Sequence, residues 1–533
     1  MKTRLISLFL VLIMVLAMLV ACGDDPLPDD DEEDDEGDVG GAPTSNWWDN
    51  LDFDATLTIM INNAVDNELS SGGESYMKGP DLKLDENGGS FEKVQNAVYD
   101  RNRAAKRALG VELSYIYCTA DWGSVAGEIR KKETTGNGTA DMYCDLMHDM
   151  VAVSVEPGIF TNVLKYTKKN TASIDGYVGG YLDISAKNGY YVDYMNDLAL
   201  SNDKTFLLAS DYYLDVLRAM LVMPFNLDMY VDRIDSTDTN GEKLYALVED
   251  GEWTWDKLMS MSNVYTGSGD ATLTSDNILM PLSVGGLSAV GLIYSTAFTS
   301  FDISYVGDKA VYNLSQEARS TIDQLFRKAA QVVSTSGVVC DESTHGDVTG
   351  VINAKEAFTN GKALFAGPNM LGVIEEDAFQ SMDRLSILPV PKLSTEYEYN
   401  TAINTRARIG AVGFSSSYKK EISALIQYMT EESETVKDEY FNKAMTGKYL
   451  VGSGAGKILT MIYNSIGDNK SMILDGLVLA RNDEVGRAHT WTELIKEGFF
   501  EGNANRVSEL WGNAINAKQS VINAAVDSWY ECD

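Results

Sequence analysis

An alternation of apolar runs and amphipathic segments between residues 55 and 146 constrains the fold most strongly. The first run, ATLTIMI, is rich in β-branched residues, and the next segment carries apolar side chains at helical spacing before Gly110. The expected elements are a strand over residues 55–61, a helix over 91–109, a strand over 111–118, a helix over 121–135 and a strand over 140–146. This β-α-β-α-β order predicts a parallel, doubly wound α/β sheet.

Polar residues follow each of these strands directly. If the strands take the usual order 2-1-3, the carboxyl ends share one edge, where open α/β sheets bind their ligands. We therefore expect this edge to form one wall of a ligand cleft. The candidate residues are Asn62, Asn63 and Asp66 after the first strand, Asp121 and Trp122 after the second, and Asp145, His148 and Asp149 at the third.

The same strand order predicts the state of two cysteines. Cys118 and Cys144 would lie on strands that flank the first strand, about 9–10 Å apart over two strand spacings. A disulfide tolerates about 7 Å between α-carbons. We therefore expect two buried free thiols, while a pairing of Cys340 with Cys532 stays open.

The first 22 residues have the pattern of an export signal. Lys2 and Arg4 precede an apolar run over residues 5–20, and the segment ends in Leu-Val-Ala-Cys. The run is too short for a membrane span. The ending resembles the lipobox of bacterial lipoproteins, which implies cleavage before Cys22 and lipid attachment to its sulfur; an ordinary signal peptide is the alternative. Residues 23–50 begin with eleven acidic residues between Asp24 and Asp38, so we expect a disordered tether there.

The charge balance excludes some partners. With 79 acidic against 43 basic residues, a net charge of -36 and no basic cluster, we expect no nucleic-acid partner and no peripheral adhesion to anionic lipid.

Two stretches carry a family resemblance. Residues 355–369 read KEAFTNGKALFAGPN, and SILPVPK follows over 386–392. Residues 363–366 and 385–390 are expected as buried strands, and Asn360-Gly361 as a left-handed helix end. This order resembles the sugar-binding branch (family 1) of the extracellular solute-binding proteins of ATP-binding-cassette importers, whose pattern is EAFxxGKAAMxxxGPW and then LPxPK. Asn369 stands where these proteins often carry a stacking Trp.

The segment LYALVEDGEWTWDKL over residues 244–258 is also very like its counterpart in that family. Its tryptophans suggest stacking platforms, but helix capping explains the pattern better. Thr254 is expected as an N-cap, with Trp253 and Leu258 in the positions of a hydrophobic staple. Farther upstream, Asp211 and Tyr212 lie in a segment that resembles the family's substrate-facing region, and we count both as ligand candidates.

The resemblance implies a two-lobed, periplasmic-binding-protein-like fold of type II. Each lobe would hold a doubly wound, mainly parallel sheet flanked by helices, with hinge crossovers. The implied limits are residues 51–215 plus 402–440 for lobe 1 and 216–401 plus 441–533 for lobe 2. The implied function is capture of a small solute, first of all a carbohydrate or oligosaccharide, for the permease subunits of an importer. The protein is expected as a monomer on the outer face of the cell membrane, held by its lipid.

Catalytic and metal patterns are missing from the sequence. Residues 454–457 hint at a phosphate loop, but Ile458 replaces the Ser or Thr that would hold magnesium. The three histidines are too scattered to suggest a zinc site. We expect that the protein binds no cofactor and no metal and that it is not an enzyme. Two alternatives stay open, a secreted glycoside hydrolase and a sensor subunit that presents ligand to a membrane receptor.

Overall fold

A computed structural model of the chain provides the structure. It describes residues 46–63, 76–85, 90–120, 123–135, 140–170, 173–174, 177–261, 280–284, 302–306, 309–313, 339–340, 354–452, 454–467, 469–481 and 504–532, with isolated residues between 320 and 331. The chain divides into two compact units, Met1–Asp49 and Asn50–Asp533. In the first unit only residues 46–49 are described. All helices and strands named below belong to the second unit.

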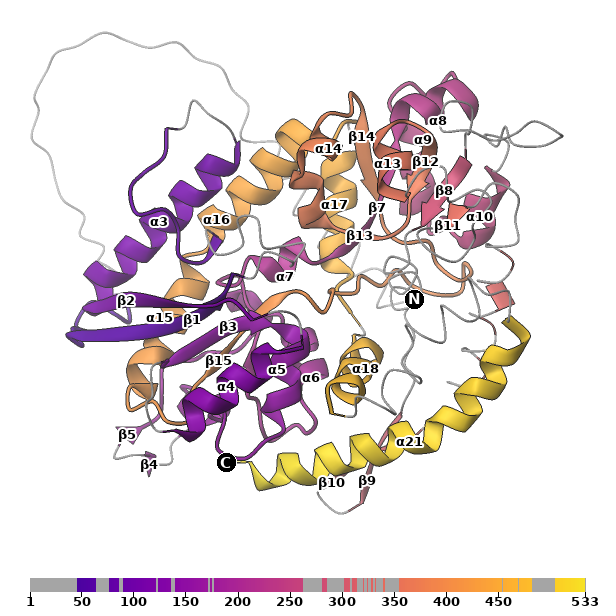
Figure 1. Cartoon of the computed structure of the whole chain (residues 1–533). Coiled ribbons are helices and arrows are strands. Elements are labelled where there is room, and N and C mark those ends of the chain that lie inside the picture. The colour runs from indigo at the N-terminus through magenta and orange to yellow at the C-terminus, as the bar shows by residue number, and fades with distance from the viewer. Residues whose placement is uncertain are drawn as a thin grey trace, which may run out of the picture. The chain divides into compact units, whose positions relative to one another are not determined.

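The amino-terminal half builds a five-stranded sheet in the order β2-β1-β3-β15-β6 (Figure 1). Its strands are β1 (Ala55–Asn62), β2 (Val111–Cys118), β3 (Met142–Leu146), β6 (Leu207–Leu208) and β15 (Arg408–Val412). β1 is parallel to β2 and β3, which confirms the predicted order 2-1-3, whereas β15 is antiparallel to both β3 and β6. This sheet is mixed rather than mainly parallel, because β15 comes from a distant part of the chain that runs back alongside β3.

Helices α3 (Ser90–Leu109) and α4 (Val125–Thr134) connect the parallel strands as predicted. Val94, Val98 and Leu109 on the expected apolar face of α3 are fully buried. Gly110 ends the helix with φ +66°, and a Cβ there would lie 2.1 Å from Asp52 Oδ1, so the turn requires glycine.

The register also settles the two cysteines. Cys118 pairs with Asn62, and Cys144 pairs with Ile61, so the two thiols lie on opposite sides of β1. Both are buried and free, as predicted. Cys532 is buried as well, and its Sγ lies 3.4 Å from the carbonyl oxygen of Ser528.

A second sheet has the order β11-β8-β12-β7-β13, with β14 also paired to β7. Its strands are β7 (Leu221–Asn226), β8 (Met280–Val284), β11 (Val339–Cys340), β12 (Ala363–Ala366), β13 (Asn369–Met370) and β14 (Leu385–Leu388). β8 is parallel to β11 and β12, whereas β7 is antiparallel to β12, β13 and β14. β12 and β14 are fully buried, which confirms both predicted strands.

Local signals around this sheet are confirmed too. Thr254 accepts a hydrogen bond from Lys257 N at 3.3 Å as the N-cap of α10 (Trp255–Ser260). Trp253 is fully buried and donates from Nε1 to Pro389 O at 2.8 Å, so it belongs to the core. Gly361, with φ +68°, follows α13 (Ala354–Thr359) in the left-handed conformation expected of it.

Two short segments cross between the sheets side by side. Met220 forms an antiparallel bridge with Ile403. Leu221 N donates to Ala402 O and Asn404 N donates to Ala219 O, both at 2.9 Å. We call residues 219–221 and 402–404 the hinge pairing. A third connection runs through α16 (Glu434–Asp438) and the π-helix η6 (Glu439–Tyr449).

Within residues 441–533, which are predicted in lobe 2, α17 (Ala455–Asn464) contacts β14 of the second sheet, whereas α18 (Lys470–Arg481) lies against helices of the first sheet. Helix α18 contacts α5 (Met147–Ser154), and α21 (Ala504–Glu531) follows it (Figure 1). Lys470 Nζ donates to three carbonyl oxygens at the end of α6 (Val192–Leu198), at 2.7–2.9 Å. This ammonium group satisfies carbonyls that a helix end leaves unpaired.

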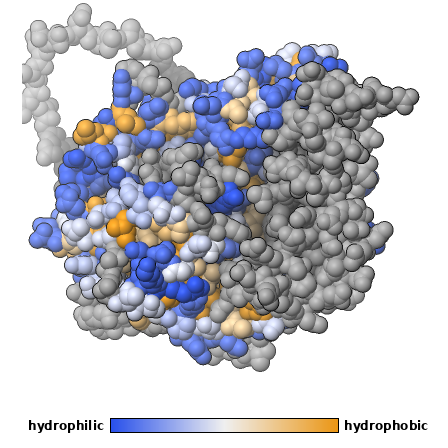
Figure 2. All heavy atoms as spheres, viewed as in Figure 1, coloured by the Kyte–Doolittle hydropathy of each residue, from blue (hydrophilic) through white to orange (hydrophobic). Residues whose placement is uncertain are grey.

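The remaining elements are η2 (Val163–Tyr166), β4 (Ser173–Ile174), β5 (Tyr177–Val178), η3 (Ala186–Asn188), α7 (Asp215–Arg218), α8 (Leu227–Arg233), α9 (Glu242–Glu249), β9 (Asp302–Val306), β10 (Lys309–Asn313), η5 (Leu371–Glu375), α14 (Asp377–Gln380) and α15 (Lys419–Glu431). None of the described helices combines the length and hydropathy that a bilayer span needs. Residues 315–334, whose apolar side chains at helical spacing predict a helix, lie almost entirely outside the described residues. Figure 2 shows hydrophilic residues over much of the described face, with small, separate hydrophobic patches.

Candidate functional site

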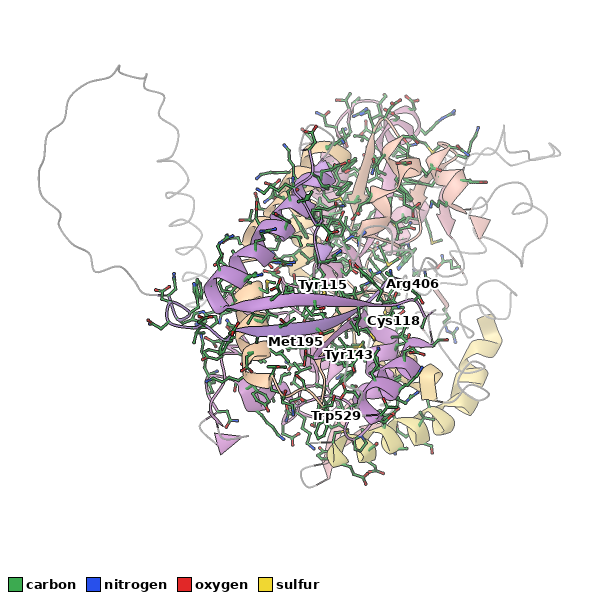
Figure 3. The ribbon with its side chains drawn as sticks, turned by 60° about the vertical axis from the view of Figure 1, so that its left-hand side comes forward. Tyr115, Cys118, Tyr143, Met195, Arg406 and Trp529 are labelled. Carbon is green, nitrogen blue, oxygen red and sulfur yellow. The ribbon has the colours of Figure 1, made fainter. Side chains whose placement is uncertain are left out.

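The carboxyl ends of β1, β2 and β3 meet at one edge of the first sheet, as the strand order requires. The register places Asn62 beside Cys118 and Asp145 at the level of Asn62, one residue past the Ile61–Cys144 pair. Asn62 is fully buried, and its Nδ2 donates to Ala120 O at 3.2 Å. Figure 3 shows Cys118 at this end of β2. We call this edge the carboxyl edge.

Two acceptor oxygens at the carboxyl edge have no hydrogen-bond partner in the part of the chain that the structure describes. They are Asn63 Oδ1 and Asp145 Oδ2, and both atoms are buried. The backbone fixes both residues, because Asn63 N donates to Cys118 O at 3.0 Å and Leu146 N donates to Asp145 Oδ1 at 2.8 Å. A buried polar atom without a partner is costly, so each oxygen favours a ligand or water that forms a hydrogen bond with it.

The Asp145 carboxyl is fully buried, and desolvation raises its pKa to about 8. The Leu146 N–H, the Arg408 guanidinium and the Asn62 side chain oppose this shift, whereas the Asp149 carboxylate adds to it. A carboxyl with this pKa is mostly protonated at neutral pH and donates as well as accepts hydrogen bonds.

The raised pKa of Asp145 predicts a pH dependence of stability. The unfolded chain releases this proton near pH 4 and the folded protein near pH 8. The stability that the protonated carboxyl contributes is therefore complete below pH 4 and is lost as the pH rises through about 8. Asp145→Asn does not ionise, so between pH 5 and pH 8 its free energy of unfolding should fall by roughly 1–3 kcal/mol less than that of the wild type.

Urea denaturation at pH 5, 6.5 and 8 measures this difference. Asp100→Asn is the control, since the Asp100 side chain is 56% exposed. Equal pH slopes for the wild type and Asp145→Asn would contradict the assignment.

His148 and Asp149 lie in the packed interior instead of on an open surface. Asp149 is 1% exposed and accepts hydrogen bonds from Gly123 N at 3.0 Å and Ala126 N at 3.1 Å. Its carboxylate thus caps the amino end of α4. His148 is 3% exposed and faces α18, where a Cβ at Gly476 would lie 3.7 Å from its ring.

Asp211 and Tyr212 are also buried, and they belong to a different part of the chain from the residues of the carboxyl edge. Asp211 forms an ion pair with Lys437 Nζ at 2.6 Å and accepts from Tyr191 OH at 2.6 Å. The Arg101 guanidinium lies 4.9 Å from the centre of the Tyr212 ring. These contacts join the segment before α7 to α16 and α3.

Asn369 belongs to the second sheet. It begins β13, pairs with Val222 of β7 and is partly exposed. Its Nδ2 donates to the carbonyl of Gly367 at 2.6 Å, within the same turn. The other ligand candidates, Asp66, Asp121 and Trp122, lie outside the described residues, as does Cys22.

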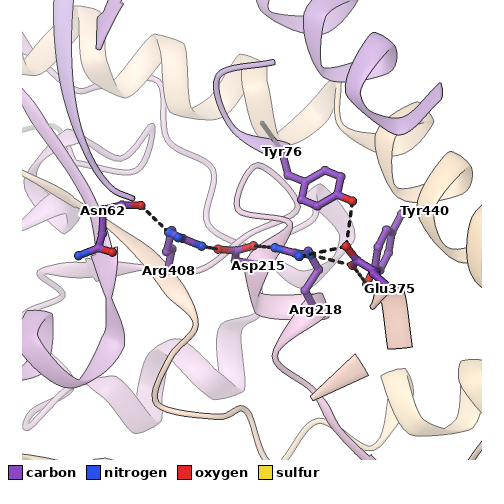
Figure 4. A network of polar contacts seen from close by, with 7 residues as sticks. All are labelled: Asn62, Tyr76, Asp215, Arg218, Glu375, Arg408 and Tyr440. Carbon is purple, nitrogen blue, oxygen red and sulfur yellow. Dashed lines mark hydrogen bonds and ion pairs between the residues drawn. The ribbon is translucent and has the colours of Figure 1, made fainter. Parts of the chain in front are cut away.

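A buried chain of alternating charges links the two sheets (Figure 4). Its charged members, which we call the charge ladder, are Arg408, Asp215, Arg218 and Glu375. Arg408 Nη1 lies 2.6 Å from Asp215 Oδ2, and Arg218 Nη1 lies 2.7 Å from Asp215 Oδ1. Arg218 then holds Glu375 with two hydrogen bonds of 2.9 and 3.0 Å.

Neutral groups bind both ends of the charge ladder. Arg408 Nε donates to the carbonyl of Asn62 at 2.9 Å. At the other end, Tyr76 OH and Tyr440 OH donate to Glu375 at 3.0 and 2.8 Å. The charge ladder therefore runs from the carboxyl edge to η5, which directly follows β13.

The electrostatics of the charge ladder follow from this alternation. Burial alone would raise the pKa of Asp215, but the guanidinium groups of Arg408 and Arg218 outweigh it and hold that pKa below its usual value. Sequence reasoning missed the charge ladder. Two signals were available, namely an Asp and an Arg three residues apart at 215 and 218, and an Arg inside the apolar segment RIGAV at 408.

Among the described residues, no group of three or more His, Cys, Asp or Glu side chains is placed to hold a metal ion. Burial raises the pKa of the Cys118 thiol to about 11, which disfavours the nucleophilic thiolate.

Comparison with solved structures identifies proteins of similar fold. The galacto-N-biose-/lacto-N-biose I-binding protein of an ABC transporter from Bifidobacterium longum is 10% identical, with a TM-score of 0.52 over 88% of this chain and 97% of that one. The GacH receptor of Streptomyces glaucescens is 11% identical, with a TM-score of 0.45 over 88% and 98%. An ABC substrate-binding protein from Listeria monocytogenes, solved with cycloalternan, is 10% identical, with a TM-score of 0.45 over 88% and 99%.

At these identities the likeness concerns the fold alone. It rests on the Bifidobacterium protein, whose TM-score is 0.52. No protein-family model matches the sequence, and a search of curated protein sequences found no match. The chain therefore has the α/β fold of periplasmic-binding-protein-like solute-binding proteins.

Proposed function

We propose that this protein captures a carbohydrate, most simply an oligosaccharide, outside the cytoplasmic membrane and delivers it to the permease subunits of an ATP-binding-cassette importer. The observation that carries the proposal is Asn63 Oδ1 at the carboxyl edge, an acceptor without a hydrogen-bond partner among the described residues, on a residue that is partly exposed. Sugar hydroxyls are donors of the kind that this oxygen needs. The fold supports the proposal, since this edge is where open α/β sheets bind ligands.

The second wall of the site is proposed around Asn369 and the segment that follows it. Asn369 is partly exposed at the start of β13, in the sheet across the hinge pairing. Its amide suits hydroxyl groups as a donor and as an acceptor. A ligand that binds both walls would favour the state in which they lie closest together.

Attachment to the membrane is part of the same proposal. Residues 1–22 have the pattern of a lipoprotein signal, and the acidic segment after Cys22 would act as a spacer between the lipid and the folded unit. A capture protein needs this location to meet its solute and its permease at the outer face of the membrane.

A thermal-shift screen of mono- and oligosaccharides tests the proposal. A sugar present at about 100 times its Kd should add about 2.7 kcal/mol to the free energy of unfolding and raise Tm. For a sugar that binds, Asn63→Ala should raise the Kd about 10-fold, which corresponds to a loss of about 1.4 kcal/mol in binding free energy. Asn442→Ala is the control, because Asn442 is exposed on η6, and this variant should bind sugar as the wild type does. A broad sugar panel with no shift would contradict the proposal.

One observation favours a second candidate function, glycoside hydrolysis. A carboxyl whose pKa is raised by burial, as burial raises the pKa of Asp145, is the usual general acid of such enzymes. A reducing-end assay on the same sugars separates the two functions. If the wild type produces new reducing ends and Asp145→Asn does not, the hydrolase is favoured. If intact sugar stabilises the protein without new reducing ends, the binding function is favoured.

A further inference from the structure

The charge ladder crosses between the sheets at the same place as the hinge pairing. Asp215 and Arg218 occupy opposite ends of α7, the single helical turn just before residues 219–221. Helix α7 contacts β15 of the first sheet and η5 beside the second. These two side chains therefore lie between the two sheets, where a change in the angle between the sheets would act on their contacts.

Each half of the charge ladder is fixed to one sheet. Arg408 begins β15 and donates to the carbonyl of Asn62, so it moves with the first sheet. Glu375 ends η5, whose Leu371 N donates to Met220 O, and β13 just before it pairs with β7. Glu375 therefore moves with the second sheet.

Breaking a contact of the charge ladder has a high cost because three of its members are buried and the Glu375 side chain is only 11% exposed. Arg218 and Arg408 are each 1% exposed and Asp215 is 4% exposed. A rotation that separates one partner leaves the other charge desolvated and unpaired. The bidentate geometry between Arg218 and Glu375 adds a strict directional requirement.

The charge ladder reaches the proposed ligand site at Arg408, the member that belongs to the first sheet. The carbonyl that accepts from Arg408 belongs to Asn62, the residue before Asn63. A ligand hydrogen-bonded to Asn63 thus acts on a backbone segment that Arg408 already holds.

We propose that the charge ladder is a latch that holds the two sheets in the arrangement seen here, and that ligand at the carboxyl edge is coupled to this latch through Asn62. The coupling to ligand rests on the proposed function, whereas the latch itself does not. Ligand binding and latch closure stabilise each other, because both fix the segment after β1 relative to η5.

Hydrogen exchange of the hinge pairing, followed by mass spectrometry, tests the latch without any ligand. The amides of Leu221 and Asn404 donate across the pairing and report its opening. Glu375→Gln keeps the side-chain shape and removes its charge, so these amides should exchange at least 10-fold faster. Amides in the middle of β1 should exchange as in the wild type.

Glu156→Gln is the matched control. Arg130 and Glu156 form a similar two-point pair at 2.8–3.0 Å, but it is exposed and joins α4 to the turn after α5, both beside the first sheet. This variant should leave exchange of the hinge pairing unchanged. Equal exchange in Glu375→Gln and the wild type, or equal acceleration in both variants, would overturn the latch.

A milder variant covers the case in which Glu375→Gln does not fold. Tyr440→Phe removes one hydrogen bond to Glu375 and keeps every charge, so hinge exchange should rise about 2- to 5-fold. Unchanged exchange in Tyr440→Phe would then overturn the latch.

For a sugar that binds, the wild type should show slower hinge exchange when saturated, and Glu375→Gln should bind more weakly. Saturation without any change at the hinge would overturn the coupling. If no sugar binds, the proposed function fails, while the exchange of the free protein still decides the latch.

Discussion

Replacing Arg218 by methionine is expected to lower the free energy of unfolding by about 3–5 kcal/mol. Arg218 is 1% exposed and lies between two carboxylates, Asp215 and Glu375. Its guanidinium carbon also lies 4.4 Å from the centre of the Tyr76 ring. Methionine fills a similar volume but leaves Glu375 buried without its counter-charge. Urea denaturation with an unchanged m-value measures the loss.

Arg130→Met is the matched control for Arg218→Met. Arg130 also pairs with a glutamate, Glu156, but its side chain is 44% exposed, so its loss should cost about 0–1 kcal/mol. If the two substitutions cost the same, burial does not set the strength of the charge ladder.

Trp529→Ala is expected to destabilise the protein by a similar amount, about 3–5 kcal/mol, because it removes a large buried side chain. Trp529 is 1% exposed, and its ring meets Phe206 edge-on with centroids 4.7 Å apart. Its Nε1 donates to Ser201 Oγ at 2.9 Å. The loss should appear in urea denaturation and as faster proteolysis within α21.

Trp529→Phe is a milder change at the same position. It keeps an aromatic ring but loses the Nε1 donor and part of the ring volume, so it should cost about 1–2 kcal/mol, less than Trp529→Ala. Wild-type stability in Trp529→Ala would show that α21 does not rely on this contact with the first sheet.

The sequence predicted the parts of the fold that depend on neighbouring residues. The alternation over residues 55–146 gave β1, α3, β2, α4 and β3, and the usual topology gave their order, from which the free thiols of Cys118 and Cys144 followed. Capping chemistry identified Thr254 as an N-cap and placed Trp253 in the core.

Features that join distant segments were beyond such reasoning. The antiparallel placement of β15 and the direction of β7 depend on pairings across hundreds of residues. The charge ladder joins residues 215, 218, 375 and 408, and no local pattern predicts which charges meet. At the candidate site, strand order located Asn62, Asn63 and Asp145, but Asp149 follows β3 equally closely and its carboxylate is taken up by α4.

The central claim is that a sugar is held, unaltered, at the carboxyl edge of the first sheet. The most direct measurement is a crystal structure of the protein with the oligosaccharide that stabilises it most. We predict sugar hydroxyls within hydrogen-bond distance of Asn63 Oδ1, with every glycosidic bond intact. A sugar bound away from residues 62–63 and 145, or found cleaved, would contradict the account.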